Sequence, residues 1–387
     1  MRTKKSIAYI AMLFMLTFLW RATTNAYATM LPLIAKYELG FQPGFIMYLS
    51  GIGGVGSFVT SFYLNHRIRR LRPYFMGSLA LLLAVVVLAP LYDPENVWLF
   101  ALLEGLSTGA TSPLIISSAG TVEDPELRER AIALYSLALS TSLAVGPFIA
   151  SGFLQMTGQS LRLSLALFAS LLALSLYFSA HMRLSAAPDR RGGSYRVIMR
   201  PAFWRAIASN AIYTFPFVAM ISYGAIVARE AFRVSYSISV LMYSAFFLTS
   251  FLARLYLTVR PVKRVDLAVT AGSAMTVLGL ILVGLHPDLP AFLLGYAILG
   301  VPHGLFWPLS LIILRRSYGD EEIYAANSYY ISMNNMIWTA VPFISGVIAS
   351  FVGISMTFII ASVPTMAVFG AYLYLSRRSS SRGFNRL

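Results

Sequence analysis

The second half of this sequence repeats the first half, without gaps, at an offset of 195 residues, and both halves are mostly apolar. The matched positions include Gly105 with Gly300, Gly109 with Gly304, Pro113 with Pro308 and Pro147 with Pro342. A repeat of this length indicates a duplicated domain, and the apolar content indicates that both copies lie in a membrane.

The composition supports the same interpretation, because 58% hydrophobic and 12% charged residues are too apolar for a soluble two-domain protein. About twenty apolar residues cross a bilayer as a helix, so we predict an all-α membrane protein with about 12 transmembrane helices in two six-helix bundles. The predicted spans cover residues 7–34, 43–64, 74–91, 97–119, 132–154 and 161–182, then 203–227, 236–258, 268–285, 291–314, 327–350 and 354–375.

The net charge of +15 is distributed unevenly between the loops. Of the 30 Lys and Arg residues, 24 lie at the termini or in loops on one side of the predicted helices. By the positive-inside rule both termini are then cytoplasmic, in a multi-pass protein of the cell membrane. The basic charge is therefore a signal of topology, and we expect the lipid bilayer as a partner and no nucleic acid.

One polar segment separates the two halves. Residues 184–200 contain two Gly, one Pro and four Arg, which have little to bury, so we predict a cytoplasmic linker there. The domains are then an N-terminal bundle over residues 1–183 and a C-terminal bundle with a short basic tail over residues 201–387.

Several kinds of chemistry find no support in the sequence. There is no cysteine, the four histidines are scattered, and no phosphate-binding loop of the nucleotide-hydrolase kind occurs. The glycines between Gly51 and Gly56 have dinucleotide-binding spacing, but they lie inside a predicted helix, where small residues allow two helices to pack closely. We expect no metal, no cofactor and no enzyme activity.

Short motifs then point to a family. The loop after the second span ends in Arg69-Arg70, Glu104-Gly105 lies in the fourth span, and Gly146-Pro147 lies in the fifth. In these motifs, taken in order, the chain resembles the major facilitator superfamily, although Asn65 and Ile68 replace the Asp and Gly of the loop motif. The resemblance implies a transporter whose two six-helix halves rock about a central site, with Arg69 and Arg70 at a gating loop.

In that family the first, fourth, seventh and tenth helices line the central site. In this sequence the same helices carry polar side chains at helical spacing, and polar faces in a lipid-spanning helix must point inward. The predicted substrate-cavity residues are Arg21, Thr24, Asn25, Thr108, Tyr213, His303 and Trp307, with Asn334 added from the eleventh helix. For His303 and Asn334 the competing interpretation is a structural hydrogen bond between helices, and for Tyr213 and Trp307 it is packing within the bundle.

Two charges inside the spans are the strongest functional candidates, because a charge in mid-bilayer is costly. Glu104 is the only carboxylate inside any predicted span, and it either carries a proton or forms a fixed ion pair with Arg21. Arg21 either belongs to that pair or binds an anionic substrate through its guanidinium group.

The sequence thus favours secondary active transport of a small organic solute by alternating access, with an anion preferred and proton coupling through Glu104. One alternative is proton-driven efflux of hydrophobic or cationic compounds. A second is a non-transporting membrane receptor or scaffold on the same fold.

Overall fold

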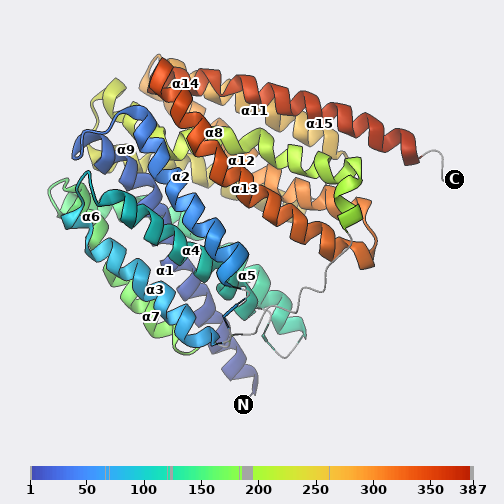
Figure 1. The fold of residues 1–387 in the computed structure, drawn as a ribbon, viewed down its shortest axis with the longest axis horizontal. Coiled ribbons are helices and arrows are strands. Elements are labelled where there is room, and N and C mark those ends of the chain that lie inside the picture. Colours follow the sequence, from blue (N-terminus) through green and yellow to red (C-terminus); the bar gives the residue numbers. More distant parts are fainter. Residues whose placement is uncertain are drawn as a thin grey trace. The chain divides into compact units, whose positions relative to one another are not determined.

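The computed structural model describes residues 2–65, 67–68, 70–119, 121–122, 125–182, 184, 195–260 and 262–383. All regular structure in these residues is helical (Figure 1). In this part of the chain 11 helices are long and apolar enough to cross a membrane, and the shorter apolar helix Leu71–Val87 adds one more. The prediction of an all-α membrane protein is therefore confirmed.

Residue contacts divide the chain into two compact units, which are described separately below. The first unit comprises Met1–Asp189 and Val234–Ser244, and the second comprises Arg190–Arg233 and Ala245–Leu387. The domain boundaries at residues 183 and 201 stay a prediction, because most of the linker lies outside the described residues.

The first unit contains the N-terminal bundle of helices. They are α1 (Arg2–Tyr37), α2 (Pro43–Val59) continued by the π-helical η1 (Thr60–Leu64), α3 (Leu71–Val87), η2 (Ala89–Leu91), α4 (Val97–Ala119), α5 (Pro125–Met156), α6 (Leu161–Leu167), α7 (Ala169–Ser179) and the short α9 (Tyr236–Leu241). Helix α9 packs on α5. There the Gln159 amide donates a hydrogen bond to the Ser237 hydroxyl at 3.2 Å and accepts one from its backbone N–H at 2.9 Å.

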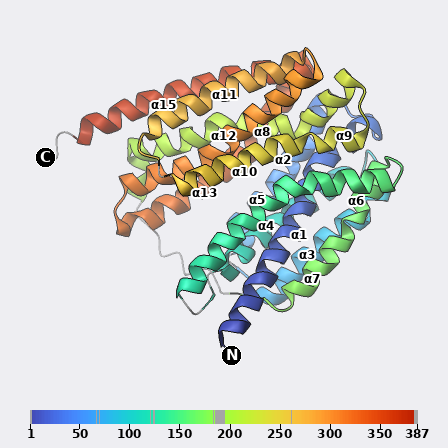
Figure 2. The same ribbon diagram turned by 180° about the vertical axis from the view of Figure 1, so that it is seen from behind.

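The second unit contains the other bundle. Its helices are η3 (Tyr195–Met199), α8 (Pro201–Phe232), α10 (Tyr243–Val259), α11 (Val265–Leu285), α12 (Leu289–Ser317), α13 (Asp320–Val352), α14 (Ile354–Ile360) and α15 (Ser362–Gly383). Helix α8 is buried along most of its length. Helices α11 and α15 lie side by side in this unit (Figures 1 and 2).

The packing of helices repeats along with the sequence. In the first unit α1 packs on α5 and α7, and α3 packs on α4. At the matching positions of the second unit α8 packs on α13 and α15, and α11 packs on α12. The prediction of two repeated bundles is confirmed, since repeat-related helices make the same contacts within their own unit.

Glycines allow the closest helix contacts in each bundle. A Cβ atom added to Gly105 of α4 would overlap the backbone of Gly53 in α2, and one added to the repeat-related Gly300 would overlap the backbone of Phe246 in α10. The interpretation of the glycines after Gly51 as a site of close helix packing is confirmed. No strand precedes them, because the described chain from Arg2 onward is helical up to this point apart from one short turn.

Most predicted spans agree with the observed helices, and the differences have local causes. The third span was predicted to cover residues 74–91. The observed α-helix is Leu71–Val87, and a 3₁₀ turn follows it at Ala89–Leu91. Pro90 in that turn lacks a backbone N–H to continue the α-helix. Three other spans are interrupted, at Phe168 between α6 and α7, at Met242 between α9 and α10 and at Ala361 between α14 and α15.

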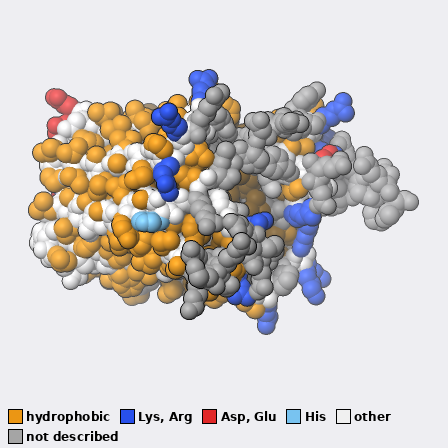
Figure 3. Space-filling model, turned by 90° about the horizontal axis from the view of Figure 1, so that it is seen from below, with side chains coloured by type: hydrophobic (Ala, Val, Ile, Leu, Met, Phe, Trp, Pro, Cys, Tyr) orange, Lys and Arg blue, Asp and Glu red, His pale blue; other side chains and the backbone are white. Residues whose placement is uncertain are grey.

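The surface is typical of a protein that faces lipid. Figure 3 shows one face on which hydrophobic side chains cover a broad area, while the Lys and Arg side chains are scattered singly from the middle of the view to its right. Large apolar side chains are widely exposed, among them Phe351 at 85% and Met156 at 77%. Such exposure is unfavourable in water and is expected where the surrounding solvent is hydrocarbon.

Candidate functional site

In the first unit, helices α1 and α4 carry polar and charged side chains within the bundle. Thr24 and Asn25 of α1 are buried, and Arg21, Glu104 and Thr108 are half-buried. These are the predicted cavity residues of the first half, and the two opposite charges of Arg21 and Glu104 lie on α1 and α4, two helices of one bundle that contact each other.

The Glu104 carboxylate is held by its own helix and faces α2. One oxygen accepts a hydrogen bond of 2.7 Å from the hydroxyl of Thr108, one turn further along α4. The other oxygen would lie 3.6 Å from a Cβ atom placed on Gly53 of α2, so the absence of a side chain at that glycine leaves room for it. Glu104 thus keeps a polar partner inside the bundle whether it is charged or protonated.

Arg21 and Glu104 do not form a direct ion pair within the described residues. The guanidinium group of Arg21 has neither a salt bridge nor a side-chain hydrogen bond there, and only the backbone carbonyl of Arg21 is used, by the Thr24 hydroxyl at 3.1 Å. A half-buried cation with no direct counter-ion is suited to binding an anion.

The residue next to Arg21 adds a polar group with no partner. The Nε1 of Trp20, nearly fully buried on α1, has no acceptor within the described part of the chain. Buried donors are normally hydrogen-bonded, so such a group is unusual. By contrast, the Tyr92 hydroxyl, outside the spans, donates to the carbonyl of Val85 at 2.7 Å, and burial raises its pKa.

In the second unit, His303 of α12 lies within a group of aromatic rings. Phe217 of α8 stacks on it with a centroid distance of 4.5 Å and an interplanar angle of 6°, and Tyr213 and Phe246 lie at 5.6 and 5.1 Å. The Nδ1 of His303 is 2.7 Å from the Ser250 hydroxyl of α10. His303 therefore has the interhelical hydrogen bond that was one of its two predicted roles, and it is also part of an aromatic wall.

The remaining predicted residues of the second half differ in what they contact. Tyr213 is buried and donates to the Leu299 carbonyl at 2.8 Å. Asn334 is buried, accepts from Asn210 at 2.7 Å and donates to the Tyr330 carbonyl, so its amide group joins α8 to α13. Trp307 is 39% exposed, which leaves much of its ring available for contact.

The predicted gating loop is described in part. Arg69 lies outside the described residues, and Arg70 is exposed just before α3. Asn65, which replaces the Asp of the family motif, donates to the Gly109 carbonyl of α4 at 3.0 Å and accepts from Tyr74 of α3 at 2.7 Å. The amide thus links three consecutive spans.

Sequence reasoning missed Phe217, which stacks on His303 and contacts Trp338 of α13 at 5.4 Å. In an apolar helix, a phenylalanine that lines a cavity cannot be distinguished by sequence pattern from one that is packed in the core. For a metal, no group of three or more His, Asp or Glu side chains in the described residues is placed to hold one.

Comparison with known proteins identifies the family. The family model of the Major Facilitator Superfamily matches residues 13–283 and 262–386, so the chain belongs to this superfamily of transporters. Among curated proteins none matches the chain.

Solved structures with the same fold are distant in sequence. A bacterial homologue of the human lysosomal transporter Spinster is 14% identical, with 97% of each chain covered and a TM-score of 0.75. The nucleoside transporter NupG is 11% identical over 95% of this chain and 99% of its own, with a TM-score of 0.76. The human organic anion transporter TETRAN is 14% identical over 95% of this chain and 99% of its own, with a TM-score of 0.64. At these identities the likeness establishes the fold alone.

Proposed function

We propose that this protein is a secondary active transporter that moves a small organic anion across the membrane by alternating access. The observation that carries the proposal is the half-buried guanidinium group of Arg21, which has no direct counter-ion within the described residues although it lies inside a helical bundle. An uncompensated charge at this depth is costly, and an anionic substrate would offset that cost whenever it is bound.

Supporting contacts lie on the same helix. Asn25 and the unpartnered donor of Trp20 add hydrogen-bonding groups to α1, and neither of them is acidic. The solved relative TETRAN, a human organic anion transporter, is an example of an anion carrier with this fold.

Proton coupling is assigned to Glu104. Its carboxylate has one hydrogen bond, to Thr108, and no direct salt bridge in the described chain, so no fixed cation prevents its protonation. The other carboxylates that fall within observed spans, such as Asp266, lie at helix ends, where water is close. Glu104 is therefore the carboxylate whose protonation state would follow the opening of the cavity.

A second candidate function is proton-driven export of hydrophobic or cationic compounds. The aromatic wall of Phe217, Tyr213 and Phe246 around His303, with Trp338 in contact with Phe217, favours it, since aromatic faces attract cations and apolar rings. On that view Glu104 would carry the proton and Arg21 would have no contact with the substrate.

The direct test is ligand-dependent thermal stabilisation of the purified protein against small organic anions and lipophilic cations. Stabilisation by an anion that is lost in Arg21→Ala, but kept in the control Arg254→Gln on α10, would support the anion site. Stabilisation only by cations, unchanged in Arg21→Ala, would refute it and favour export. Stabilisation without any flux in proteoliposomes would indicate a receptor or scaffold.

We further propose that both termini are cytoplasmic in the cell membrane, as the distribution of Lys and Arg indicates. Because the chain has no cysteine, single cysteines can be introduced at two exposed loop positions, Glu95→Cys and Arg260→Cys. An impermeant maleimide applied to intact cells should label the first and not the second, and the reverse pattern would invert the topology.

A further inference from the structure

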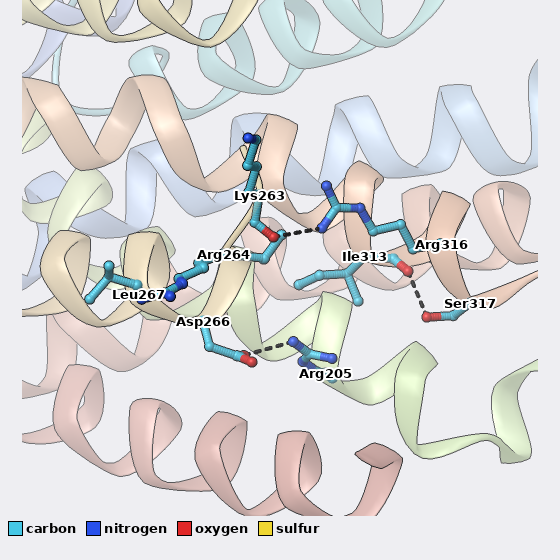
Figure 4. Close-up of a pocket in the computed structure, with 9 residues that line it drawn as sticks. Arg205, Lys263, Arg264, Asp266, Leu267, Ile313, Arg316 and Ser317 are labelled. Carbon is cyan, nitrogen blue, oxygen red and sulfur yellow. Dashed lines mark hydrogen bonds and ion pairs between the residues drawn. The ribbon is translucent and has the colours of Figure 1, made fainter. Parts of the chain in front are cut away.

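A basic pocket of about 390 Å³ lies in the second unit, where three helices begin or end (Figure 4). It is lined by Arg205 in the second turn of α8, by Ile313, Arg316 and Ser317 in the last turns of α12, and by Lys263, Arg264, Val265, Asp266 and Leu267 at the start of α11. Helix ends of this kind lie near the boundary between hydrocarbon and water in a membrane protein.

The pocket carries a surplus of positive charge. Its lining includes four cationic side chains and one acidic side chain, that of Asp266. The Asp266 carboxylate is already engaged, because its Oδ1 accepts hydrogen bonds from Arg205 at 2.7 Å, Tyr372 at 2.6 Å and Ser376 at 3.0 Å. It can neutralise Arg205 in this way, but not the other three cations.

Two of those three cations make no interaction with any other group in the described residues. The side chains of Lys263 and Arg264 form no ion pair or hydrogen bond within the described residues, although both line the pocket. Figure 4 shows the Lys263 ammonium group and the Arg264 guanidinium group extending from the loop without an interaction to any other residue drawn. Their charge is therefore available to a ligand.

The third cation, Arg316, holds in place the loop that carries Lys263 and Arg264. The Arg316 guanidinium group donates to the backbone carbonyl of Val262 at 2.5 Å. It also donates, at 3.4 Å, to the backbone carbonyl of Lys263, the bond drawn in Figure 4. The loop before α11 is thereby tied to the end of α12. A held loop loses less entropy when it binds a ligand than a loose one.

The start of α11 adds backbone donors to the same pocket. Val265, Asp266 and Leu267 are the first residues of this 21-residue helix, and their N–H groups have no carbonyl earlier in the helix to bond. The side chain of the preceding Arg264 does not cap them. The partial positive charge of the helix N-terminus therefore adds to that of the side chains.

We propose that this pocket binds a phosphate group, either that of an anionic phospholipid headgroup or that of a free phosphate ion. Lys263 and Arg264 supply the charge, and the N-terminus of α11 supplies backbone hydrogen bonds. Leu267, which lines the pocket and is 61% exposed, gives an apolar surface beside the cations. Cations next to exposed apolar surface at the membrane boundary match a lipid, whose phosphate lies next to its acyl chains.

The test uses the full-length protein in detergent, with native mass spectrometry to count retained lipids and thermal unfolding to measure stabilisation. The probes are phosphatidylglycerol, phosphatidylcholine and inorganic phosphate. The variant Lys263→Gln/Arg264→Gln is compared with Arg67→Gln/Arg260→Gln, which removes two exposed cations that do not line the pocket.

The expected result is that the wild type and the Arg67/Arg260 control retain phosphatidylglycerol equally. The Lys263/Arg264 variant should bind it about tenfold to thirtyfold more weakly. Stabilisation by inorganic phosphate that matches the effect of the lipid and depends on Lys263 and Arg264 would identify the free ion as the ligand. Equal losses in the two double variants, or no loss in the Lys263/Arg264 variant, would overturn the proposal.

Discussion

Arg21 and Glu104 carry opposite charges inside the first bundle, on α1 and α4, yet no direct ion pair joins them in the described part of the chain. The carboxylate bonds to Thr108 instead. Breaking a buried ion pair typically costs about 3–5 kcal/mol, so a fixed pair would act as a structural element. Two charges that interact only through space can each change partner during a transport cycle.

A double-mutant cycle tests this arrangement. We expect Arg21→Ala and Glu104→Gln to change the free energy of unfolding nearly additively, with a coupling energy below about 1 kcal/mol. The measurement is denaturant unfolding of both single variants and the double variant in mixed micelles. A double variant that regains the stability lost in each single one, with coupling of about 3 kcal/mol, would mean that the residues form a fixed pair after all.

The closest helix contact in the first bundle should tolerate no added methyl group. Gly105→Ala places a Cβ atom against the backbone of Gly53, which cannot move aside as a side chain would, and we expect destabilisation of about 1–3 kcal/mol or more. The repeat-related Gly300→Ala should behave alike. Gly77→Ala is the control, since nothing lies within 4 Å of its added Cβ and alanine favours the helix. Equal thermal stability of Gly105→Ala and Gly77→Ala would contradict the observed packing.

The Asp266 network should stabilise the second unit. Asp266→Asn weakens charge-assisted hydrogen bonds to Arg205, Tyr372 and Ser376. We expect the free energy of unfolding to fall by only about 1–2 kcal/mol, because the side chain is 54% exposed and solvent screens its charge. The ion pair of Arg200 with Glu322 is more exposed overall, at 46% and 39%, so Glu322→Gln should cost less than about 1 kcal/mol. Thermal unfolding of the two variants should rank them in this order.

Much of the fold could be predicted from the sequence, because a lipid solvent imposes long apolar helices. The spans 43–64 and 97–119 agree with the observed α2–η1 and α4 to the residue. The breaks at Phe168 and Met242 could not be predicted, since neither residue disfavours a helix as Pro or Gly does. They depend on tertiary packing, which a single sequence does not show.

The sequence picks out candidate site residues where they are polar. Arg21 and Glu104 stand out in apolar helices, and the structure places them on α1 and α4 of one bundle. Phe217 has no such contrast with its neighbours, and its stacking on His303 depends on how α8 and α12 pack. The basic pocket also went unnoticed, because Lys263, Arg264 and Arg316 each look like ordinary loop cations until the helix ends bring them together.

The most direct test of the account is uptake of the stabilising anion into proteoliposomes under an imposed pH gradient. Wild-type protein should accumulate the anion, and Thr108→Val, which leaves the carboxyl group in place, should retain part of this uptake. In Glu104→Gln the rate of gradient-driven uptake should fall at least about a hundredfold, which is the size of effect expected when a proton-transfer group is removed. The variant should still exchange the anion across the membrane. Gradient-driven uptake by Glu104→Gln at the wild-type rate would contradict the account.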